Sequence, residues 1–243
     1  MTKFEFMRSH SSSGMLTLSQ VARISDSLRG GSLAVLPTET GYMLAAVATL
    51  PESVEHAFAV KSRQTAKVMH VACASLEMAQ EVGQLSPDAL RLLGAFTPGP
   101  LSVIVPKTAV LPDRLVTLDG TVGIRIPDHP ATLQVIHEVG KPLTATSLNV
   151  SGAASVPLEK LELDTLNWPP GEAVHVLADD ESIRYDLPST LVRLSGGPPE
   201  VLRAGPVTEA DVRRVAGLPG YLEAAGQGPP QVGLPDLAAS FGS

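Results

Sequence analysis

The segment from Thr121 to Ser147 constrains the fold more than any other part of the chain. Apolar residues alternate with other residues over 122–126, which is typical of a β-strand with one buried face. A helix with an early proline and a terminal glycine is predicted over 130–140, and a second strand over 143–147. A strand, a helix and a strand in succession predict an α/β domain. Arg125 lies on the strand face opposite the apolar side chains, where its cation can meet a ligand.

The rest of the chain repeats this mixture of short strands and amphipathic helices. Further helices are predicted at 17–28, 51–61, 76–82, 87–95 and from 208 onward. Further strands are predicted at 33–36, 68–73, 101–105, 174–177, 190–194 and 201–203. A capping box at 49–52 is expected to start the second helix, and 155–171 is expected to be a long loop or an irregular helix. Because β-α-β units are mixed with adjacent strands, the sheet is predicted to be mixed.

Length and charge narrow the class of protein. A chain of 243 residues can bury a full core, and we predict one domain over 16–216, with a flexible leader at 1–15 and a flexible Gly/Pro/Ala-rich tail at 217–243. A net charge of −7 argues against a general polyanion-binding surface but leaves room for a local basic cleft. The single cysteine, Cys73, cannot form an internal disulfide. With no long apolar run, the chain is predicted to be a soluble cytoplasmic protein without a membrane partner.

Common catalytic signatures are missing from the sequence. It contains no Gly-x4-Gly-Lys-Ser/Thr loop, no Gly-x-Gly-x-x-Gly, no Gly-x-Ser-x-Gly and no His-Glu-x-x-His. The six histidines are scattered without metal-ligand spacing, so no protein-bound metal is predicted. Cys73 lies among apolar residues and is expected to be a buried, inert thiol.

Several small-residue segments carry or precede a cation, and each has an ordinary explanation when taken alone. Lys61-Ser62-Arg63 fits a solvated helix end, 147–152 fits a turn, and Arg125 fits a surface residue paired with a carboxylate. Taken together in this order, they predict a pocket for an anionic ligand.

The joint pattern resembles the YrdC-like family of threonylcarbamoyl-AMP synthases from about residue 18 to 215. The segments that carry the resemblance are Pro37-Thr38-Glu39-Thr40-Gly41-Tyr42-Met43-Leu44, Lys61-Ser62-Arg63, Pro98-Gly99-Pro100-Leu101-Ser102, Val122-Gly123-Ile124-Arg125-Ile126-Pro127, Ser147-Leu148-Asn149-Val150-Ser151-Gly152, Ser189-Thr190-Leu191-Val192 and Leu202-Arg203-Ala204-Gly205. The resemblance implies an open, twisted, mixed β-sheet flanked by helices, with a concave ligand cleft.

It also implies the reaction. L-threonine, bicarbonate and ATP with Mg²⁺ would give threonylcarbamoyl-AMP and pyrophosphate, and the product would pass to a threonylcarbamoyl transferase complex that modifies adenosine 37 of certain tRNAs. Contact with tRNA itself would be weak. An anionic carbamate that attacks an anionic phosphate needs fixed cations and oriented hydroxyls, which agrees with the residue types present.

The family's site residues carry over to positions of this sequence. The resemblance implies catalytic roles for Lys61, Arg63, Ser147 and Asn149. It implies ATP contacts from Arg63, Thr121, Ser147, Ser155 and Arg203. It implies an amino-acid site lined by Thr38, Tyr42, Arg125, Ala145 and Ser189, in which Arg125 holds the α-carboxylate.

Departures from the family pattern cluster around the acceptor amino acid. Met43 stands where the family has glycine, and Gln64 stands where it has proline. Some members place a threonine-contacting histidine at the position of Ala72, and His70 lies two residues earlier on the same strand face. We therefore expect altered amino-acid selectivity. Two alternatives stay open: a paralogue that uses another amine or carbamoyl donor, and a non-catalytic RNA-binding module, against which the acidic charge and few aromatic residues argue.

Overall fold

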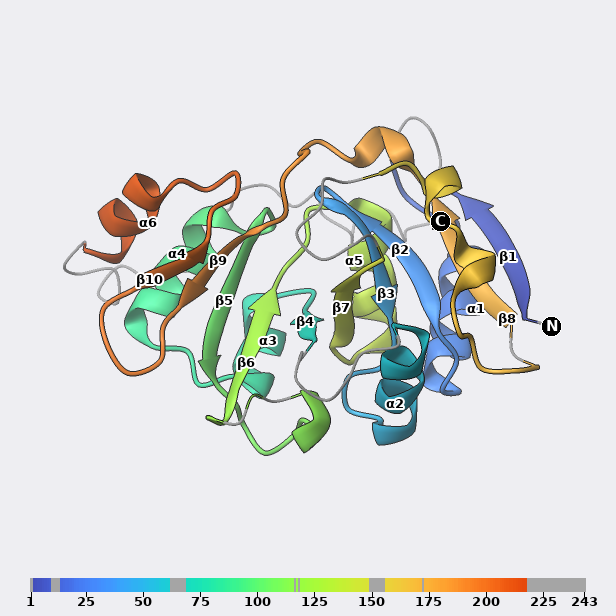
Figure 1. The fold of residues 1–243 in the computed structure, drawn as a ribbon, viewed down its shortest axis with the longest axis horizontal. Coiled ribbons are helices and arrows are strands. Elements are labelled where there is room, and N and C mark those ends of the chain that lie inside the picture. The colour runs from blue at the N-terminus through green and yellow to red at the C-terminus, as the bar shows by residue number, and fades with distance from the viewer. Residues whose placement is uncertain are drawn as a thin grey trace, which may run out of the picture.

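The protein is described here from a computed structural model, which describes residues 2–9, 14–61, 69–115, 117, 119–148, 156–171 and 173–217. Within them a single ten-stranded sheet runs in the order β1-β8-β2-β3-β7-β4-β6-β5-β9-β10 (Figure 1). The pairs β1–β8, β2–β8, β4–β6 and β5–β9 are parallel and the other neighbours are antiparallel. The prediction of a mixed sheet is therefore confirmed.

The strands are short, as the sequence predicted. They are β1 Lys3–Arg8, β2 Ala34–Thr38, β3 Gly41–Ala45, β4 His70–Ala72, β5 Leu101–Pro106, β6 Thr121–Arg125, β7 Leu143–Ser147, β8 Ala173–Ala178, β9 Thr190–Arg193 and β10 Glu200–Arg203. The segment 156–171 is irregular and contains short 3-10 turns.

The helices begin and end close to their predicted signals. They are α1 Leu18–Arg29, α2 Pro51–Val60, α3 Leu76–Val82, α4 Pro87–Phe96, α5 Pro130–Val139 and α6 Glu209–Ala216. Thr17 and Thr208 cap α1 and α6, and Gly140 ends α5 with a left-handed φ of 68°. The capping box predicted for α2 is wrong: Leu50 occupies the cap position and makes no side-chain hydrogen bond there, so Pro51 at the first turn is the remaining start signal.

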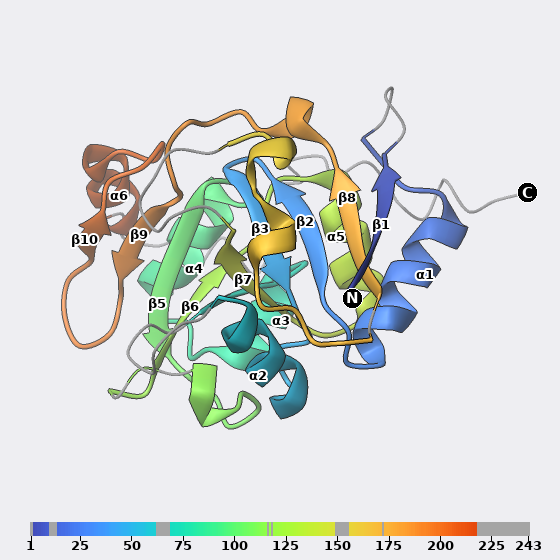
Figure 2. The same ribbon diagram turned by 45° about the vertical axis from the view of Figure 1, so that its right-hand side comes forward.

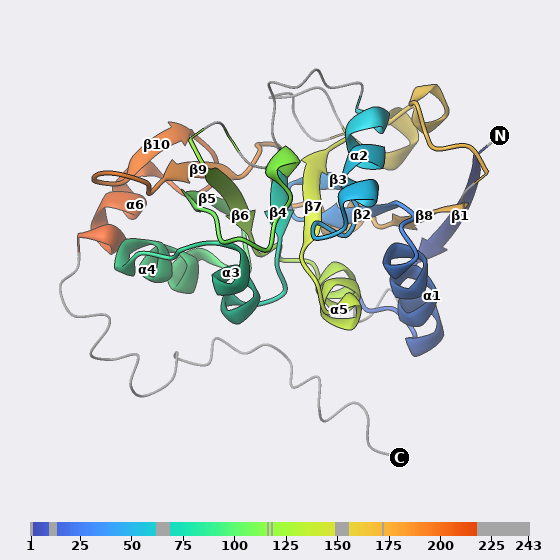
Figure 3. The same cartoon turned by 90° about the horizontal axis from the view of Figure 1, so that it is seen from below.

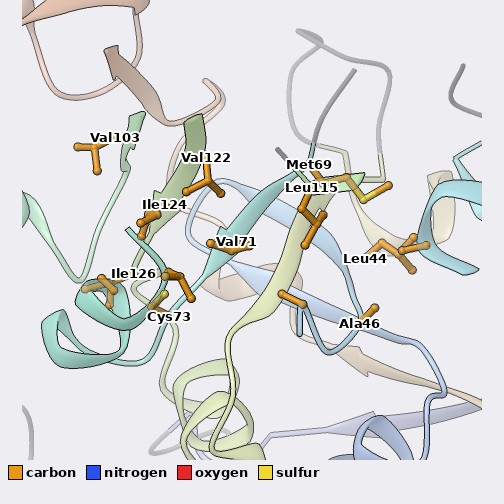
Figure 4. Close-up of a cluster of buried hydrophobic side chains, with 14 of the residues drawn as sticks. Leu44, Ala46, Met69, Val71, Cys73, Val103, Leu115, Val122, Ile124 and Ile126 are labelled. Carbon is orange, nitrogen blue, oxygen red and sulfur yellow. The ribbon is translucent and has the colours of Figure 1, made fainter. Parts of the chain in front are cut away.

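Alternate residues along the central strands β2, β3 and β4 divide between two hydrophobic clusters, which define two faces of the sheet. On the first face Val35, Leu44 and Val71 pack with side chains of α2, α3, α4 and α6. On the second face Leu36 and Met43 pack with side chains of α1 and α5. Figure 3 shows α2 and α5 on opposite sides of the sheet, and Figure 4 shows part of the first cluster. Across β5 and β6 the cluster of α1 and α5 contributes no covering side chain, and the polar residues Ser102, Thr121 and Arg125 lie on the second face there.

The predicted leader at 1–15 is in part a strand, which corrects the sequence analysis. Residues 3–8 form β1, which pairs in parallel with β8 at the edge of the sheet (Figure 2). The ring of Phe4 meets Trp168 edge to face with centroids 5.5 Å apart. Glu5 forms an ion pair with Arg23 of α1 at 2.6 Å. The alternation of charged and apolar residues over 3–8 carries this signal, but the polar stretch after it favoured disorder. The tail at 218–243 lies outside the described residues.

Removal of residues 1–9 is expected to lower the free energy of unfolding by about 2 to 4 kcal/mol, because it exposes β8 and leaves Trp168 without its aromatic partner. Urea denaturation of the full chain and of the truncated chain measures the difference. A Phe4→Ala variant should show part of the same loss. Equal midpoints for the full and truncated chains would show that β1 does not stabilise the sheet.

Candidate active site

Arg125 is the last residue of β6, and its side chain lies on the second face. Val122 and Ile124 enter the first cluster, so Thr121, Gly123 and Arg125 project from the opposite side of the strand. The predicted orientation of Arg125 is thus confirmed. Only 8% of the arginine is exposed, which makes it a buried cation that must be paired or hydrogen-bonded.

The turn between β2 and β3 holds the Arg125 guanidinium. Nη2 donates to Glu39 Oε1 at 2.6 Å, and both Nη1 and Nη2 donate to Thr40 Oγ1 at 3.2 Å. The turn is itself braced, because Thr38 Oγ1 donates to the Gly41 carbonyl at 2.7 Å and accepts from the Thr40 N–H at 3.2 Å. Gly41 has a φ of 116°, a conformation that side chains with a Cβ rarely adopt. Thr38 therefore stabilises the turn that presents Glu39 and Thr40.

A row of polar side chains continues from Arg125 toward the far edge of the sheet. Arg125 is paired with Ser102 of β5, whose hydroxyl is 2.9 Å from that of Ser189. Arg203 of β10 donates from Nε to the Ser189 carbonyl at 3.0 Å and from Nη2 to its hydroxyl at 3.1 Å. Gly205 permits this contact, because a Cβ there would lie 2.4 Å from the carbonyl oxygen of Pro188. We call Arg125, Ser102, Ser189 and Arg203 the polar row.

The polar row carries two cations and one paired carboxylate. Among the described residues, Glu39 forms an ion pair with Arg125 and no carboxylate pairs with Arg203. Burial lowers the pKa of Arg203, and the nearby charge of Arg125 lowers it further. Arginine still remains charged at neutral pH, so the arrangement favours an anionic ligand with planar oxygens.

The centre of the second face is formed by β4, β6 and β7. His70 is paired with Ala145 on one side, and its ring covers Gly123 on the other. A Cβ at Gly123 would lie 2.4 Å from His70 Cδ2, so glycine is required for the ring to take this place. Ala72 is paired with Arg125 and is completely buried in the second cluster. His70 and Ala72 thus share a face, as predicted.

Ser147 and Thr121 lie on strands that form this centre, and Lys61 reaches the end of one of them from α2. Lys61 ends α2, and its Nζ donates to the Leu148 carbonyl at 3.5 Å, which brings it to the end of β7. Ser147 is exposed at that end and is paired with Met43. Met43 is buried among the side chains of α1 and α5, so its thioether fills the core behind Ser147. The Thr121 hydroxyl lies 2.7 Å from that of Thr117 at the start of β6.

Some predicted site residues are not brought to this face. The ring of Tyr42 belongs to the first cluster, and its hydroxyl donates to Asp180 Oδ1 at 2.8 Å and accepts from the Asp179 N–H at 3.0 Å. Burial raises the pKa of this phenol above its usual value. Tyr42 therefore anchors the turn at Asp179 and Asp180 from the face opposite Arg125, and its place in the amino-acid site stays a prediction. Arg63, Asn149 and Ser155 lie outside the described residues.

Glu39, Thr40 and Ser102 were not among the predicted site residues, although all three lie within the segments that resemble the family. Glu39 could have been noticed as an acidic residue within a stretch of small and apolar residues, where the backbone is expected to be buried. Because glutamate is rarely buried unless it is paired, such a position predicts a cationic partner. Ser102 could be recognised only through strand pairing, because Ser102 and Ser189 are separated by 87 positions in the sequence.

Other features of the described residues do not compete with this site. A surface hollow of about 560 Å³ lies under the β9–β10 hairpin, where Arg193 pairs with Glu200 and Arg213 pairs with Glu209. Each of these two arginines thus has a paired carboxylate, whereas Arg203 of the polar row has none among the described residues. In the described ranges, no three His, Cys, Asp or Glu side chains come together as metal ligands. None of the described helices combines the length and apolarity needed to cross a bilayer.

Comparison with known sequences gives a consistent group of relatives. Residues 26–205 match the sequence model of the Sua5/YciO/YrdC family, described as "Telomere recombination". A protein of Mycobacterium leprae (strain TN) is 33% identical over 192 residues, which cover 79% of this chain and 85% of the relative. The threonylcarbamoyl-AMP synthase of Pyrococcus abyssi (strain GE5 / Orsay) is 31% identical over 203 residues, which cover 78% of this chain and 55% of that protein.

Comparison with solved structures supports the same group. The crystal structure of P. abyssi Sua5 in complex with L-threonine superposes with a TM-score of 0.75 at 27% identity. The match covers 89% of this chain and 61% of that chain, so the Sua5 chain extends well beyond the shared fold.

Proposed function

Because the chain belongs to the Sua5/YciO/YrdC family, we propose that it is an L-threonylcarbamoyladenylate synthase, an enzyme of the nucleotidyltransferase type. It condenses L-threonine, bicarbonate and ATP into threonylcarbamoyl-AMP and pyrophosphate. The polar row is the observation that carries this proposal: a buried arginine, a half-buried arginine and two buried serine hydroxyls face a place where two anions must meet. Two comparisons support L-threonine as the substrate. One is with the P. abyssi threonylcarbamoyl-AMP synthase, and the other is with P. abyssi Sua5 in its complex with L-threonine.

The proposed chemistry needs positioning rather than a covalent nucleophile. The threonine amine and bicarbonate give a carbamate with loss of water. A carbamate oxygen then attacks the α-phosphorus of ATP, the bond from that phosphorus to the bridging oxygen breaks, and pyrophosphate leaves. Mg²⁺ would enter with the triphosphate and screen its charge. The residues of this chain contribute fixed cations and hydroxyls that offset the repulsion between carbamate and phosphate.

We propose a division of the work among the site residues. We assign the amino-acid carboxylate to Arg125, with Ala145 and Ser189 as neighbours, and the nucleotide to Arg203, Thr121 and Ser147. Lys61 faces the phosphates from the end of α2, and Arg63, Asn149 and Ser155 are assigned to the same half by family resemblance alone. We propose that the product serves tRNA modification through a transferase complex and that the enzyme works in the cytoplasm.

The proposal is tested by incubating the full chain with ATP, Mg²⁺, labelled bicarbonate and a panel of amino acids. Mass spectrometry then identifies the acyl adenylate, and a coupled assay follows pyrophosphate. Threonylcarbamoyl-AMP is expected only when all substrates are present. Adenylate formed with a different amine would favour the paralogue, and RNA binding without any adenylate would favour the RNA-binding module.

Replacing Arg203 by alanine is expected to weaken ATP binding by about 1.5 to 3 kcal/mol, the usual value of a hydrogen bond to a charged group. Isothermal titration calorimetry with ATP and Mg²⁺ measures the change. Arg193→Ala removes an exposed arginine from the adjacent strand and serves as the matched control, with ATP affinity expected to stay within twofold of the wild-type value. Unchanged affinity in Arg203→Ala would remove this residue from the nucleotide half.

His70 is expected to read the threonine side chain, because Ala72 is buried while His70 is partly exposed beside Ala145 on the same face. A buried hydrogen bond to a hydroxyl discriminates far more strongly than apolar packing, which separates threonine from valine by only about 1 to 3 kcal/mol. We expect His70→Ala to reduce the ratio of kcat/KM for threonine over valine by about tenfold, with the KM for ATP unchanged. An unaltered ratio would mean that another residue reads the hydroxyl.

A further inference from the structure

Glu39 is a completely buried carboxylate that the assignments above leave without a role. Burying an ion pair is costly, and replacement of such pairs by apolar residues is often neutral or stabilising. The Glu39–Arg125 pair therefore needs an explanation other than fold stability.

The contacts of Glu39 show that Glu39 fixes the position of Arg125, rather than the reverse. Its Oε2 accepts from the Asp128 N–H at 2.9 Å, and its carbonyl accepts from the N–H groups of Arg184 and Tyr185 at 2.9 and 3.1 Å. Arg184 in turn pairs with the Asp128 side chain. Both the backbone and the second carboxylate oxygen of Glu39 are thus fixed without any help from Arg125. The carboxylate is a fixed point, and the long arginine side chain is the group that it orients.

The orientation leaves two N–H groups of Arg125, the one on Nε and the second one on Nη1, without an acceptor among the described residues. Nη2 is taken by Glu39, and Thr40 accepts from both Nη1 and Nη2. Nε is buried, and among the described residues no group accepts a hydrogen bond from it. A buried N–H without an acceptor costs free energy, which a ligand oxygen at that place would recover.

We propose that Glu39 is a positioning residue, which fixes the plane of the Arg125 guanidinium so that Nε–H donates to the carboxylate of the amino-acid substrate. The inference rests on the proposed function for the identity of that carboxylate. Glu39 touches no substrate itself. Its charge also offsets that of Arg125, so that Arg125 and Arg203 can lie in one row without a second counter-ion.

The experiment compares the full-length wild type with Glu39→Gln, Glu39→Asp and the matched control Glu5→Gln. Glu5 forms an ion pair with Arg23 at 2.6 Å, the same length as the Glu39–Arg125 pair, at the far edge of the sheet. Steady-state kinetics give KM for L-threonine and kcat, and calorimetry gives the dissociation constant of L-threonine alone. NMR of the guanidinium nitrogens, with Arg125→Lys to assign the signal, measures how fast the Arg125 Cζ–Nη bonds rotate.

We expect Glu39→Gln to raise KM and the dissociation constant of threonine about tenfold or more, the value of one charge-assisted hydrogen bond, while kcat changes less than about threefold. Rotation of the Arg125 guanidinium should become fast in Glu39→Gln and stay restricted in Glu5→Gln. Glu39→Asp, which keeps the charge, should recover part of the affinity.

Unchanged threonine affinity in Glu39→Gln, or unchanged guanidinium rotation, would overturn the inference while the proposed function stands. A wild-type protein that makes no adenylate from threonine would instead contradict the proposed function. In that case the rotation measurement still decides whether Glu39 holds Arg125.

Discussion

Arg125→Met is expected to lower the free energy of unfolding by about 3 to 5 kcal/mol, because it leaves Glu39 buried, charged and unpaired. The same change should reduce kcat/KM for threonine by about 10² to 10³, since truncation of a buried charged partner removes 2 to 5 kcal/mol of binding free energy. Urea denaturation and steady-state kinetics measure the two losses separately.

The double variant Glu39→Gln/Arg125→Met separates fold from function. With the buried charge neutralised, most of the lost stability is expected to return, whereas the activity is not. A double variant that recovered both would show that Arg125 acts only through stability. A single variant as stable as the wild type would contradict the burial of Glu39 that the structure describes.

Lys61→Ala is expected to lower kcat by about 10² to 10³ while the dissociation constant of ATP changes less than about threefold. The reason is that a cation beside developing phosphate charge stabilises the transition state more than the bound substrate. Lys61 ends α2 beside the Leu148 carbonyl, close to the exposed Ser147. Single-turnover measurement of adenylate formation isolates the chemical step, and calorimetry gives ATP affinity.

Two further variants sharpen this prediction. Lys61→Arg should restore activity only in part, because a planar fork does not replace a compact ammonium group. Lys107→Ala, which breaks an exposed ion pair with Asp113, should leave turnover at the wild-type level. Wild-type turnover in Lys61→Ala would show that Lys61 has no catalytic role and is a solvated residue at the end of a helix.

Local patterns predicted the elements well wherever chain geometry alone decides them. The face of Arg125 followed from the alternation in β6, and the end of α5 followed from Gly140. β1 and β3 were not predicted. β3 is hidden in a segment of small residues directly after β2, where a tight turn reverses the chain, and β1 is stabilised by Trp168 and Arg23, far away in the sequence.

The site was predictable as a set of residues but not as an arrangement. Arg125 and Arg203 were both proposed as cations of an anion site, whereas the serine pair between them depends on β5 lying beside β9. The face of Tyr42 could not be predicted, because neighbouring residues in a strand face opposite sides of the sheet and tertiary packing decides which side each helix covers. Glu39 was overlooked because burial cannot be read from residue type.

The polar row joins residues that the ribosome makes at very different times. The hydrogen bond between Ser102 and Ser189 can form only after Ser189, which comes 87 positions later, has been synthesised. Arg203 is added only in the final strand. Contacts of such long sequence separation form late, after the cost of loop closure has been met by the sheet around them. A nascent chain that has emerged only as far as β8 can therefore build most of the sheet yet holds a single arginine of the row. The complete row therefore forms only when β9 and β10 pair, and a chain that ends at β8 holds Arg125 and Ser102 without Ser189 and Arg203.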